Sequence, residues 1–134
     1  MEMTREQAFV EMFHRKCRVP IGLKPQLISE DEYQLRFDLI QEELDEYLDA
    51  CVDQDLVKIA DALGDLLYVV YGAAVVHGLD LEFIFEEIHK SNMTKEPQET
   101  HIPEIHKIKK GPNYVQPNLI PFVTEGVIEH HESM

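Results

Sequence analysis

EELDEYLDACVDQDLVKIADALGDLLYVVYGAAVV, residues 42–76, is the stretch that decides the fold. Its first part places acidic residues one helical turn apart, and its last part is apolar at nearly every position. Residues three and four apart share one face of a helix, so these carboxylates project side by side. The stretch therefore predicts two consecutive helices, each with an acidic group: Glu42, Glu43 and Glu46 on the first, Asp61 and Asp65 on the second.

Carboxylates in this arrangement repel one another, by about 0.2–0.5 kcal/mol per pair in an isolated helix. Water can screen them on a solvated face, or a cation can neutralise them. Leu35 and Leu39 lie in line with the acidic residues of the first helix, and Asp65 directly precedes the apolar run. A covered carboxylate is costly unless it is paired or coordinates a metal, so a metal site centred on Asp65 is predicted. For Asp61, an ion pair with Lys58 is the alternative.

Four helices and an irregular tail are expected, which makes the chain an all-α, four-helix bundle. Capping residues mark several helix ends, among them Thr4, Ser29, Gly78 and Asp80. The helices are predicted at residues 4–17, 30–51, 55–77 and 81–90. One domain is expected, with residues 1–95 as the helical core and residues 96–134 as the tail.

Apolar residues at helical spacing predict which helix faces are buried. On the first helix the predicted inner residues are Phe9, Phe13 and Cys17. On the second they are Tyr33, Phe37, Ile40, Leu44, Tyr47, Leu48 and Cys51. The third helix is apolar on nearly every side and is predicted to be buried all round. Four helices are too few to cover it, so self-association is expected.

Charge and composition exclude several functions. The chain has 134 residues, 44% of them hydrophobic, and a net charge of −14, which opposes binding to nucleic acid. Its longest apolar run, residues 66–76, is too short to span a bilayer. The N-terminus has no signal-peptide pattern, and Cys17 and Cys51 fit free buried thiols, so a cytoplasmic location is expected.

Positive charge gathers in the last third of the chain, which is also rich in proline. Five lysines lie there, at positions 90, 95, 107, 109 and 110, near Asn92, Asn113 and Tyr114. If this segment folds back over the acidic residues, its lysines would complement a triphosphate and its tyrosine ring could stack on a base. A solvated tail is the alternative, and we expect the last residues to be disordered.

These motifs resemble the all-α nucleoside triphosphate pyrophosphohydrolases, which include MazG proteins, dimeric dUTPases, dCTP pyrophosphatases and phosphoribosyl-ATP pyrophosphohydrolase. The family signature is EExxE followed on the next helix by ExxD, and residues 42–46 match the first half fully. In the second half Asp65 matches, but Ala62 replaces the usual glutamate and Asp61 is its potential substitute. Phe13-His14, DLLYVVYG from Asp65, EIHKSNMTK from Glu87 and KKGPNYVQP from Lys109 are similar to the MazG-like branch near the dimeric dUTPases.

The resemblance implies cleavage between the α and β phosphates of a nucleotide, giving a nucleoside monophosphate and pyrophosphate with Mg²⁺ or Mn²⁺. It implies that Glu42 activates water and that metal is held by Glu43, Glu46, Asp65 and, as the substitute, Asp61. Candidate substrate contacts are Lys90, Asn92, Lys95, Lys109 and Tyr114. It also implies a homodimer or homotetramer, and it leaves the preferred base open.

Two other functions fit parts of the sequence. A di-metal carboxylate bundle needs Glu-x-x-His pairs, and Glu11 with His14 and Glu86 with His89 have that spacing. Both glutamates, however, fall away from the apolar faces of their helices, and His14 reads as a surface histidine on a polar face. A nucleotide sensor without catalysis is the second alternative, because Ala62 interrupts the acidic motif.

Overall fold

A computed structural model describes residues 3–96 and 110–124 of the chain. The described residues form helices and loops with no β-strand: α1 (Arg5–Cys17), α2 (Glu30–Val52), α3 (Leu56–His77), α4 (Leu81–Asn92) and the short α5 (Ile120–Val123). The predicted all-α class with four main helices is confirmed, and the helix ends lie close to the predicted ones. The one-turn helix α5 in the tail was not predicted.

Polar side chains cap the starts of the four main helices. The capping oxygens accept hydrogen bonds from backbone N–H groups in the first turn and belong to Thr4, Ser29, Asp55 and Asp80. These bonds satisfy donors that have no partner inside the helix. Gly78 ends α3 with a φ of 71°, a left-handed conformation in which glycine is unstrained.

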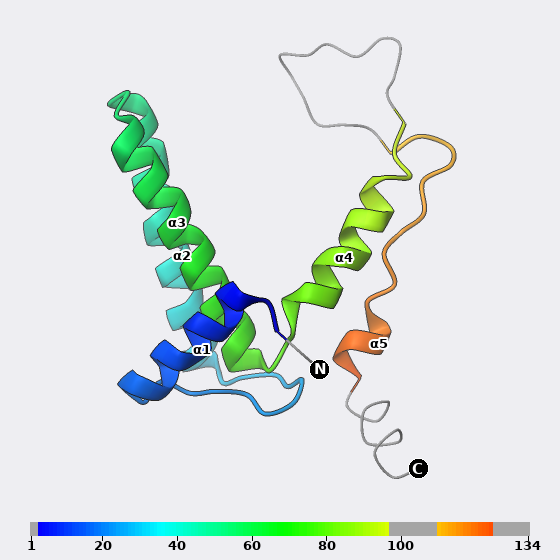
Figure 1. Cartoon of the computed structure of the whole chain (residues 1–134), viewed down its shortest axis with the longest axis horizontal. Coiled ribbons are helices and arrows are strands. Elements are labelled where there is room, and N and C mark those ends of the chain that lie inside the picture. Colours follow the sequence, from blue (N-terminus) through cyan, green and yellow to red (C-terminus); the bar gives the residue numbers. More distant parts are fainter. Residues whose placement is uncertain (1–2, 97–109, 125–134) are drawn as a thin grey trace.

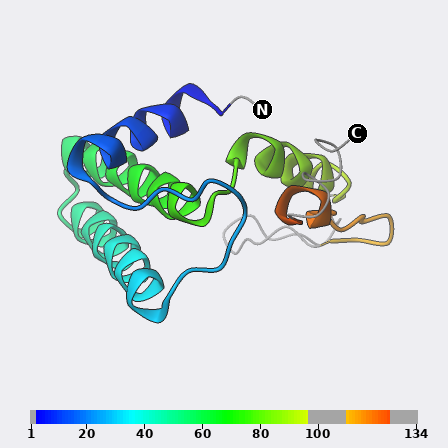
Figure 2. The same ribbon diagram turned by 90° about the horizontal axis from the view of Figure 1, so that it is seen from below.

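Helix α3 is the centre of the arrangement. Figure 2 shows it between α1 and α2, and it packs against both of them. Helices α2 and α3 run antiparallel as a hairpin joined by residues 53–55, and they form one arm of a V in Figure 1. At Gly78–Asp80 the chain turns, and α4 forms the other arm.

The described part of the tail runs along α4. Ser91 on α4 donates from its Oγ to the carbonyl oxygen of Val115 at 2.7 Å, and the N–H of Val115 donates to Thr94 Oγ1 at 2.8 Å. Further along, the N–H of Asn118 donates to Glu87 Oε2 at 3.0 Å. These bonds hold residues 110–124 on the second arm of the V, and α5 lies beside α4 in both views (Figures 1 and 2).

Several apolar faces that were predicted to be buried are exposed in the single chain. On α2, Phe37 is 57% and Leu48 62% exposed, and on α1 both Phe9 and Phe13 are exposed. Cys17 is exposed as well. Helix α3 packs on the other side of α2. The face of α2 that contacts α3 is therefore the one with the acidic residues, and it includes the buried Ala50. Periodicity identified the apolar stripes correctly, but not the partner that covers them.

Helix α3 departs from two expectations. By length and mean hydropathy, 1.6 over its most apolar window, it could cross a bilayer, although its uninterrupted apolar run is short. It nevertheless packs between α1 and α2 and carries Asp61 and Asp65, as core helices of helical proteins do. It is also not buried all round, because Leu63 and Leu67 are exposed in the single chain.

Gln7 ties α1 to the turn between α3 and α4. This residue is almost fully buried, its Nε2 donates to the carbonyl oxygen of Leu79 at 2.7 Å, and its Oε1 accepts from the N–H of Leu81 at 3.0 Å. One side chain therefore satisfies two backbone groups at the hinge of the V.

We predict that Gln7→Ala lowers the free energy of unfolding by about 1–3 kcal/mol, since it leaves those two backbone groups without their partner. Urea denaturation followed by circular dichroism measures this change. The matched control is Gln34→Ala, which removes an exposed amide bonded to the exposed Asp38 and should cost much less. Equal losses for the two variants would contradict the role assigned to Gln7.

Candidate metal centre

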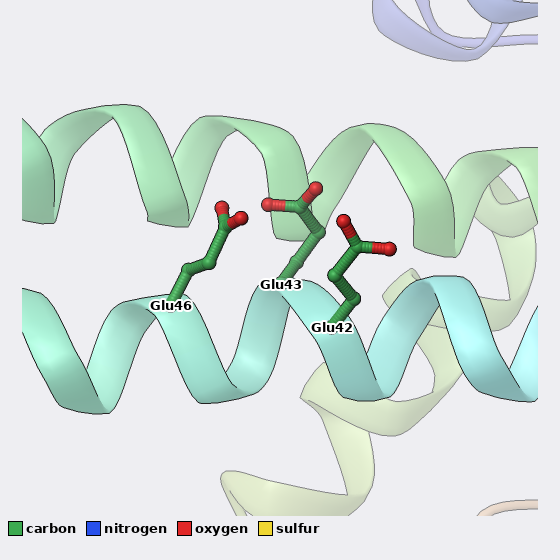
Figure 3. A group of neighbouring side chains, drawn as sticks. All are labelled: Glu42, Glu43 and Glu46. Carbon is green, nitrogen blue, oxygen red and sulfur yellow. The ribbon is translucent and has the colours of Figure 1, made fainter.

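Three glutamates on α2 converge on one point. Ligand atoms of Glu42, Glu43 and Glu46 all lie within 4.8 Å of one another. Figure 3 shows the three carboxylates projecting from α2 toward α3. The one-turn spacing predicted from the sequence therefore produces a true cluster.

Glu43 is the least solvated member of this cluster. Its Oε2 is buried without a hydrogen-bond partner among the described residues. Burial, a hydrogen bond with Glu46 and the nearby charges of Glu46, Asp65 and Glu42 raise the pKa of Glu43 from 4.5 to about 7. A carboxylate in this position is poorly compensated at neutral pH unless it keeps a proton or binds a cation.

Helix α3 contributes Asp65 and Asp61 from the opposite side. Asp65 lies close enough to Glu43 and Glu46 for their charges to affect one another. Asp65 was predicted to be covered but is exposed in the single chain, because α3 is not buried all round. Loss of some hydration, followed by the charges of Asp61 and Glu46, still raises the pKa of Asp65. The three glutamates thus form a close cluster, and Asp65 and Asp61 lie near enough to act on it or on each other through their charges. We call Glu42, Glu43, Glu46, Asp61 and Asp65 the acidic centre.

Ala62 lies at the edge of the acidic centre, where the family motif has a glutamate. It is 2% exposed and lines a cavity of about 300 Å³ together with Glu46, Asp49, Ala50, Asp53, Lys58 and Asp61. Among the described residues, no ion pair joins Lys58 to Asp61, so the alternative interpretation of Asp61 is not supported. Ala62 and Asp61 thus line the same open space.

The residues of the acidic centre suit a divalent cation. Mg²⁺ and Mn²⁺ prefer carboxylate oxygens, and the centre offers several, including the unpartnered Oε2 of Glu43. A cation bound there would replace the proton that Glu43 holds and remove the repulsion among its neighbours. Glu43, Glu46, Asp65 and Asp61 are the residues that would hold it.

A second cluster forms where the tail meets α4. The Nζ of Lys110 lies 5.0 Å and that of Lys95 5.9 Å from the centre of the Tyr114 ring. The hydroxyl of Tyr114 lies 3.3 Å from Ser91 Oγ and donates to it, because the one hydroxyl proton of Ser91 goes to the carbonyl oxygen of Val115. We call Lys95, Lys110 and Tyr114 the lysine–tyrosine cluster.

Within one chain, this cluster does not cover the acidic centre. It lies at the end of the α4 arm, whereas the acidic centre lies on the α2–α3 arm of the V (Figure 1). Of the other predicted substrate residues, Lys90 pairs with Glu86 at 3.7 Å and Asn92 is exposed at the end of α4. Lys109 lies outside the described residues. The predicted site residues therefore form two groups, one on each arm.

Three residues near these groups were missed or misread from the sequence. His14 was expected on the surface but is 3% exposed, because α1 packs on α3 through the side that carries it. Arg36 was not considered, since a lone arginine on a helix is usually solvated, and it lies on the side of α2 that faces α3. Lys110 was counted among the lysines of the tail but not selected.

The spacing that suggested a di-metal carboxylate bundle has another explanation. Glu11 forms an ion pair with Arg15 at 2.9 Å, and Glu86 forms one with Lys90 at 3.7 Å. Both glutamates are thus engaged along their own helices. The Nδ1 of His14 lies 3.0 Å from the carbonyl oxygen of Pro20, so this histidine also has a structural partner.

Fold and centre together define an all-α protein whose carboxylates suit a divalent cation. The chain belongs to the phosphoribosyl-ATP pyrophosphohydrolase family, which its sequence matches over residues 7–92, more than half of its length. The family is named for a pyrophosphohydrolase activity on phosphoribosyl-ATP, and its members use Mg²⁺. The resemblance seen in the sequence is therefore confirmed.

A relative occurs in a giant virus. An uncharacterized protein of Acanthamoeba polyphaga mimivirus is 51% identical over 49 residues. The match covers 37% of this chain and 20% of the viral protein, so the chain spans only about a fifth of that relative.

We predict that the metal-free protein loses stability as the pH rises. Glu43 keeps its proton up to a pKa of about 7 when folded but titrates near 4.5 when unfolded. The folded state therefore binds more protons across this window, and the free energy of unfolding falls as the pH increases through it. Melting temperatures measured in EDTA should decrease between about pH 5 and pH 8, and Mg²⁺ should raise them more at the upper end.

Glu43→Gln is the control for this prediction. It removes the titrating group while keeping its shape, so the decrease of Tm with pH should become shallower than in the wild type. If Mg²⁺ leaves the melting temperature of the wild type unchanged at every pH, the acidic centre does not bind the cation.

Proposed function

We propose that this chain is a Mg²⁺- or Mn²⁺-dependent nucleoside triphosphate pyrophosphohydrolase. It would cleave a ribo- or deoxyribonucleotide between the α and β phosphates and release the nucleoside monophosphate and pyrophosphate. The observation that carries the proposal is the buried Oε2 of Glu43, which has no hydrogen-bond partner among the described residues, within a cluster of acids. Membership of the phosphoribosyl-ATP pyrophosphohydrolase family supports the reaction class.

The residues of the acidic centre would divide the work between them. Glu43, Glu46 and Asp65, with Asp61, hold the cation, which supplies positive charge to the phosphate oxygens as negative charge develops. Glu42 is more exposed than Glu43 and projects toward the same point, so it is free to orient the attacking water and accept its proton.

The phosphates and the base would be bound by positive and aromatic groups. Lys95 and Tyr114 already lie together in the lysine–tyrosine cluster. Ammonium groups would contact the phosphates, and the tyrosine ring would stack on the base once the lysines turn from the ring to the phosphates. Lys90, Asn92 and Lys109 are the other proposed contacts. These residues serve the reaction only if they reach an acidic centre.

A second copy of the chain is the proposed route. The exposed apolar side chains of α2 and α3, such as Phe37, Leu48, Leu63 and Leu67, form a surface that a homodimer or homotetramer would cover. Only 28% of the most apolar window of α3 is buried within one chain. Assembly would place the lysine–tyrosine cluster of one chain near the acidic centre of another, where their charges are complementary.

A nucleotide sensor without catalysis is the second candidate, and Ala62 favours it. In place of a metal-binding glutamate, the chain has a buried methyl group next to a cavity. A centre that lacks one ligand could hold a metal–nucleotide complex without turning it over. Analysis of reaction products separates the two functions.

We predict turnover when the purified protein is incubated with Mg²⁺ or Mn²⁺ and a panel of ribo- and deoxyribonucleoside triphosphates. Chromatography should show monophosphate and pyrophosphate, and Glu46→Gln or Asp65→Asn should reduce the rate at least about a hundredfold by removing a charged ligand. Asp38→Asn, an exposed acid on α2 outside the centre, is the matched control. Diphosphate with inorganic phosphate, or full activity of Glu46→Gln, would sink this assignment.

Mixing of two inactive variants tests the assembly. One carries Glu46→Gln, and the other carries Lys95→Ala with Tyr114→Ala. If the lysine–tyrosine cluster acts on a neighbouring chain, subunit exchange should restore roughly a quarter of wild-type activity, because half the pairs are mixed and each holds one intact site. No recovery after verified exchange would show that both groups act within one chain.

A further inference from the structure

Arg36 is a positive side chain on the inner side of α2 without an acidic partner in direct contact. Among the described residues, no hydrogen bond or ion pair involves its guanidinium. It reaches across to α3, where a Cβ placed on Gly72 would lie 3.2 Å from its Nη1. Burial lowers the pKa of Arg36, and the charge of Glu32, one turn earlier on α2, opposes this effect. Glycine at position 72 therefore allows the guanidinium to rest against the α3 backbone.

His14 lies beside the same glycine. Its Nε2 would lie 3.4 Å from the same Cβ on Gly72. Its Nδ1 lies 3.0 Å from the carbonyl oxygen of Pro20, which can only accept, so Nδ1 carries the proton. Burial is the main cause that lowers the pKa of His14, and the positive charge of Arg36 lowers it further. The hydrogen bond to Pro20 and the charge of Glu11 act in the opposite direction. The neutral ring therefore turns an accepting Nε2 toward the region of Arg36.

The acidic centre and Arg36 lie on the same seam between α2 and α3. Arg36 precedes Glu43 by seven residues, and on the antiparallel α3 Gly72 follows Asp65 by seven. Two turns of helix separate the groups, which is about 10 Å along the axis. The seam therefore presents a carboxylate centre and, two turns away, an available guanidinium.

The two ends of the seam differ in charge. Beyond Ala62 the cavity is lined by Glu46, Asp49, Asp53 and Asp61, with Lys58 as its one basic residue. A polyphosphate would be repelled there. On the other side of the centre stands Arg36, and a guanidinium fork matches the oxygens of a phosphate group.

We propose that Arg36 binds the terminal phosphate of the nucleoside triphosphate and that His14 is its positioning residue. This proposal rests on the proposed function and adds the direction in which the triphosphate lies on the seam. The α phosphate is then at the end of the bound chain nearer Glu46, and the released pyrophosphate is the part held by Arg36. Nucleotides with two phosphates lack the group that Arg36 recognises.

The test compares binding of two probes to the full chain by calorimetry with Mg²⁺. The probes are the non-hydrolysable α,β-methylene tri- and diphosphates of the nucleoside whose triphosphate the wild type hydrolyses fastest. Arg36→Gln should weaken the triphosphate about tenfold and leave the diphosphate within about twofold of wild type. Arg15→Gln, which removes an exposed arginine of α1, is the matched control and should change neither.

Gly72→Ala provides a variant that keeps every charge. Its methyl group would lie 3.2 Å from Nη1, so the flexible arginine has to move aside. Alanine is the better helix former, so Tm should not fall, while triphosphate affinity should still decrease. His14→Phe should also lower the triphosphate affinity. The double variant His14→Phe/Arg36→Gln should bind the triphosphate no more weakly than Arg36→Gln alone, because His14 acts through Arg36.

The outcomes are distinct. The proposal is overturned if Arg36→Gln weakens the binding of both probes equally. It is also overturned if Arg36→Gln and Gly72→Ala both leave the triphosphate affinity unchanged. Neither result affects the proposed function, provided that the wild type hydrolyses the nucleotide. A wild type that hydrolyses no nucleotide would overturn the proposed function, and with it this inference.

Discussion

The repulsion among carboxylates at the seam of α2 and α3 is the constraint on which the rest of the structure depends. Glu43 is placed between its helical neighbours and Asp65, with one oxygen away from water, and its pKa rises to about 7 as a result. A chain that keeps such a group must compensate it with a proton or a cation. The capped helices, the tight hairpin and the packing of α1 on α3 all serve to hold this arrangement in place.

The acidic centre and the lysine–tyrosine cluster lie on different arms of the V. Acidic residues converge on the α2–α3 arm, while Lys95 and Lys110 flank Tyr114 on the α4 arm (Figure 1). The hydrogen bonds of Ser91 and Thr94 to the tail build the second cluster, so its geometry does not depend on the acidic centre. A substrate with negative phosphates and an aromatic base has chemistry that matches both groups, which is why assembly of chains is part of the proposed function.

Much of this architecture could be predicted from the sequence, because its signals are local. The caps at Ser29 and Asp80 and the left-handed Gly78 set helix ends through bonds within a few residues. The spacing of Glu42, Glu43 and Glu46 likewise determines that they share a face. Ala62 was recognised as a departure from the motif, and its burial beside a cavity follows from that position.

The remainder depends on packing between distant segments, which no local pattern encodes. The apolar face around Phe37 reads as core, yet α3 packs on the other side of α2. His14 reads as a surface residue because its helix neighbours are polar, although α3 covers it. The position of Arg36 depends on Gly72 of α3, which is far away in the sequence. In each case, the burial of the residue depends on which face of its helix packs against α3.

The most direct measurement of the central claim is the number of protons released when Mg²⁺ binds. Calorimetric titrations in two buffers of different ionisation enthalpy give this number at each pH. If a cation replaces the proton of Glu43, whose pKa is about 7, binding at pH 7 should release about half a proton per chain, and less as the pH rises. Binding without proton release at pH 7, or no binding at all, would contradict the account.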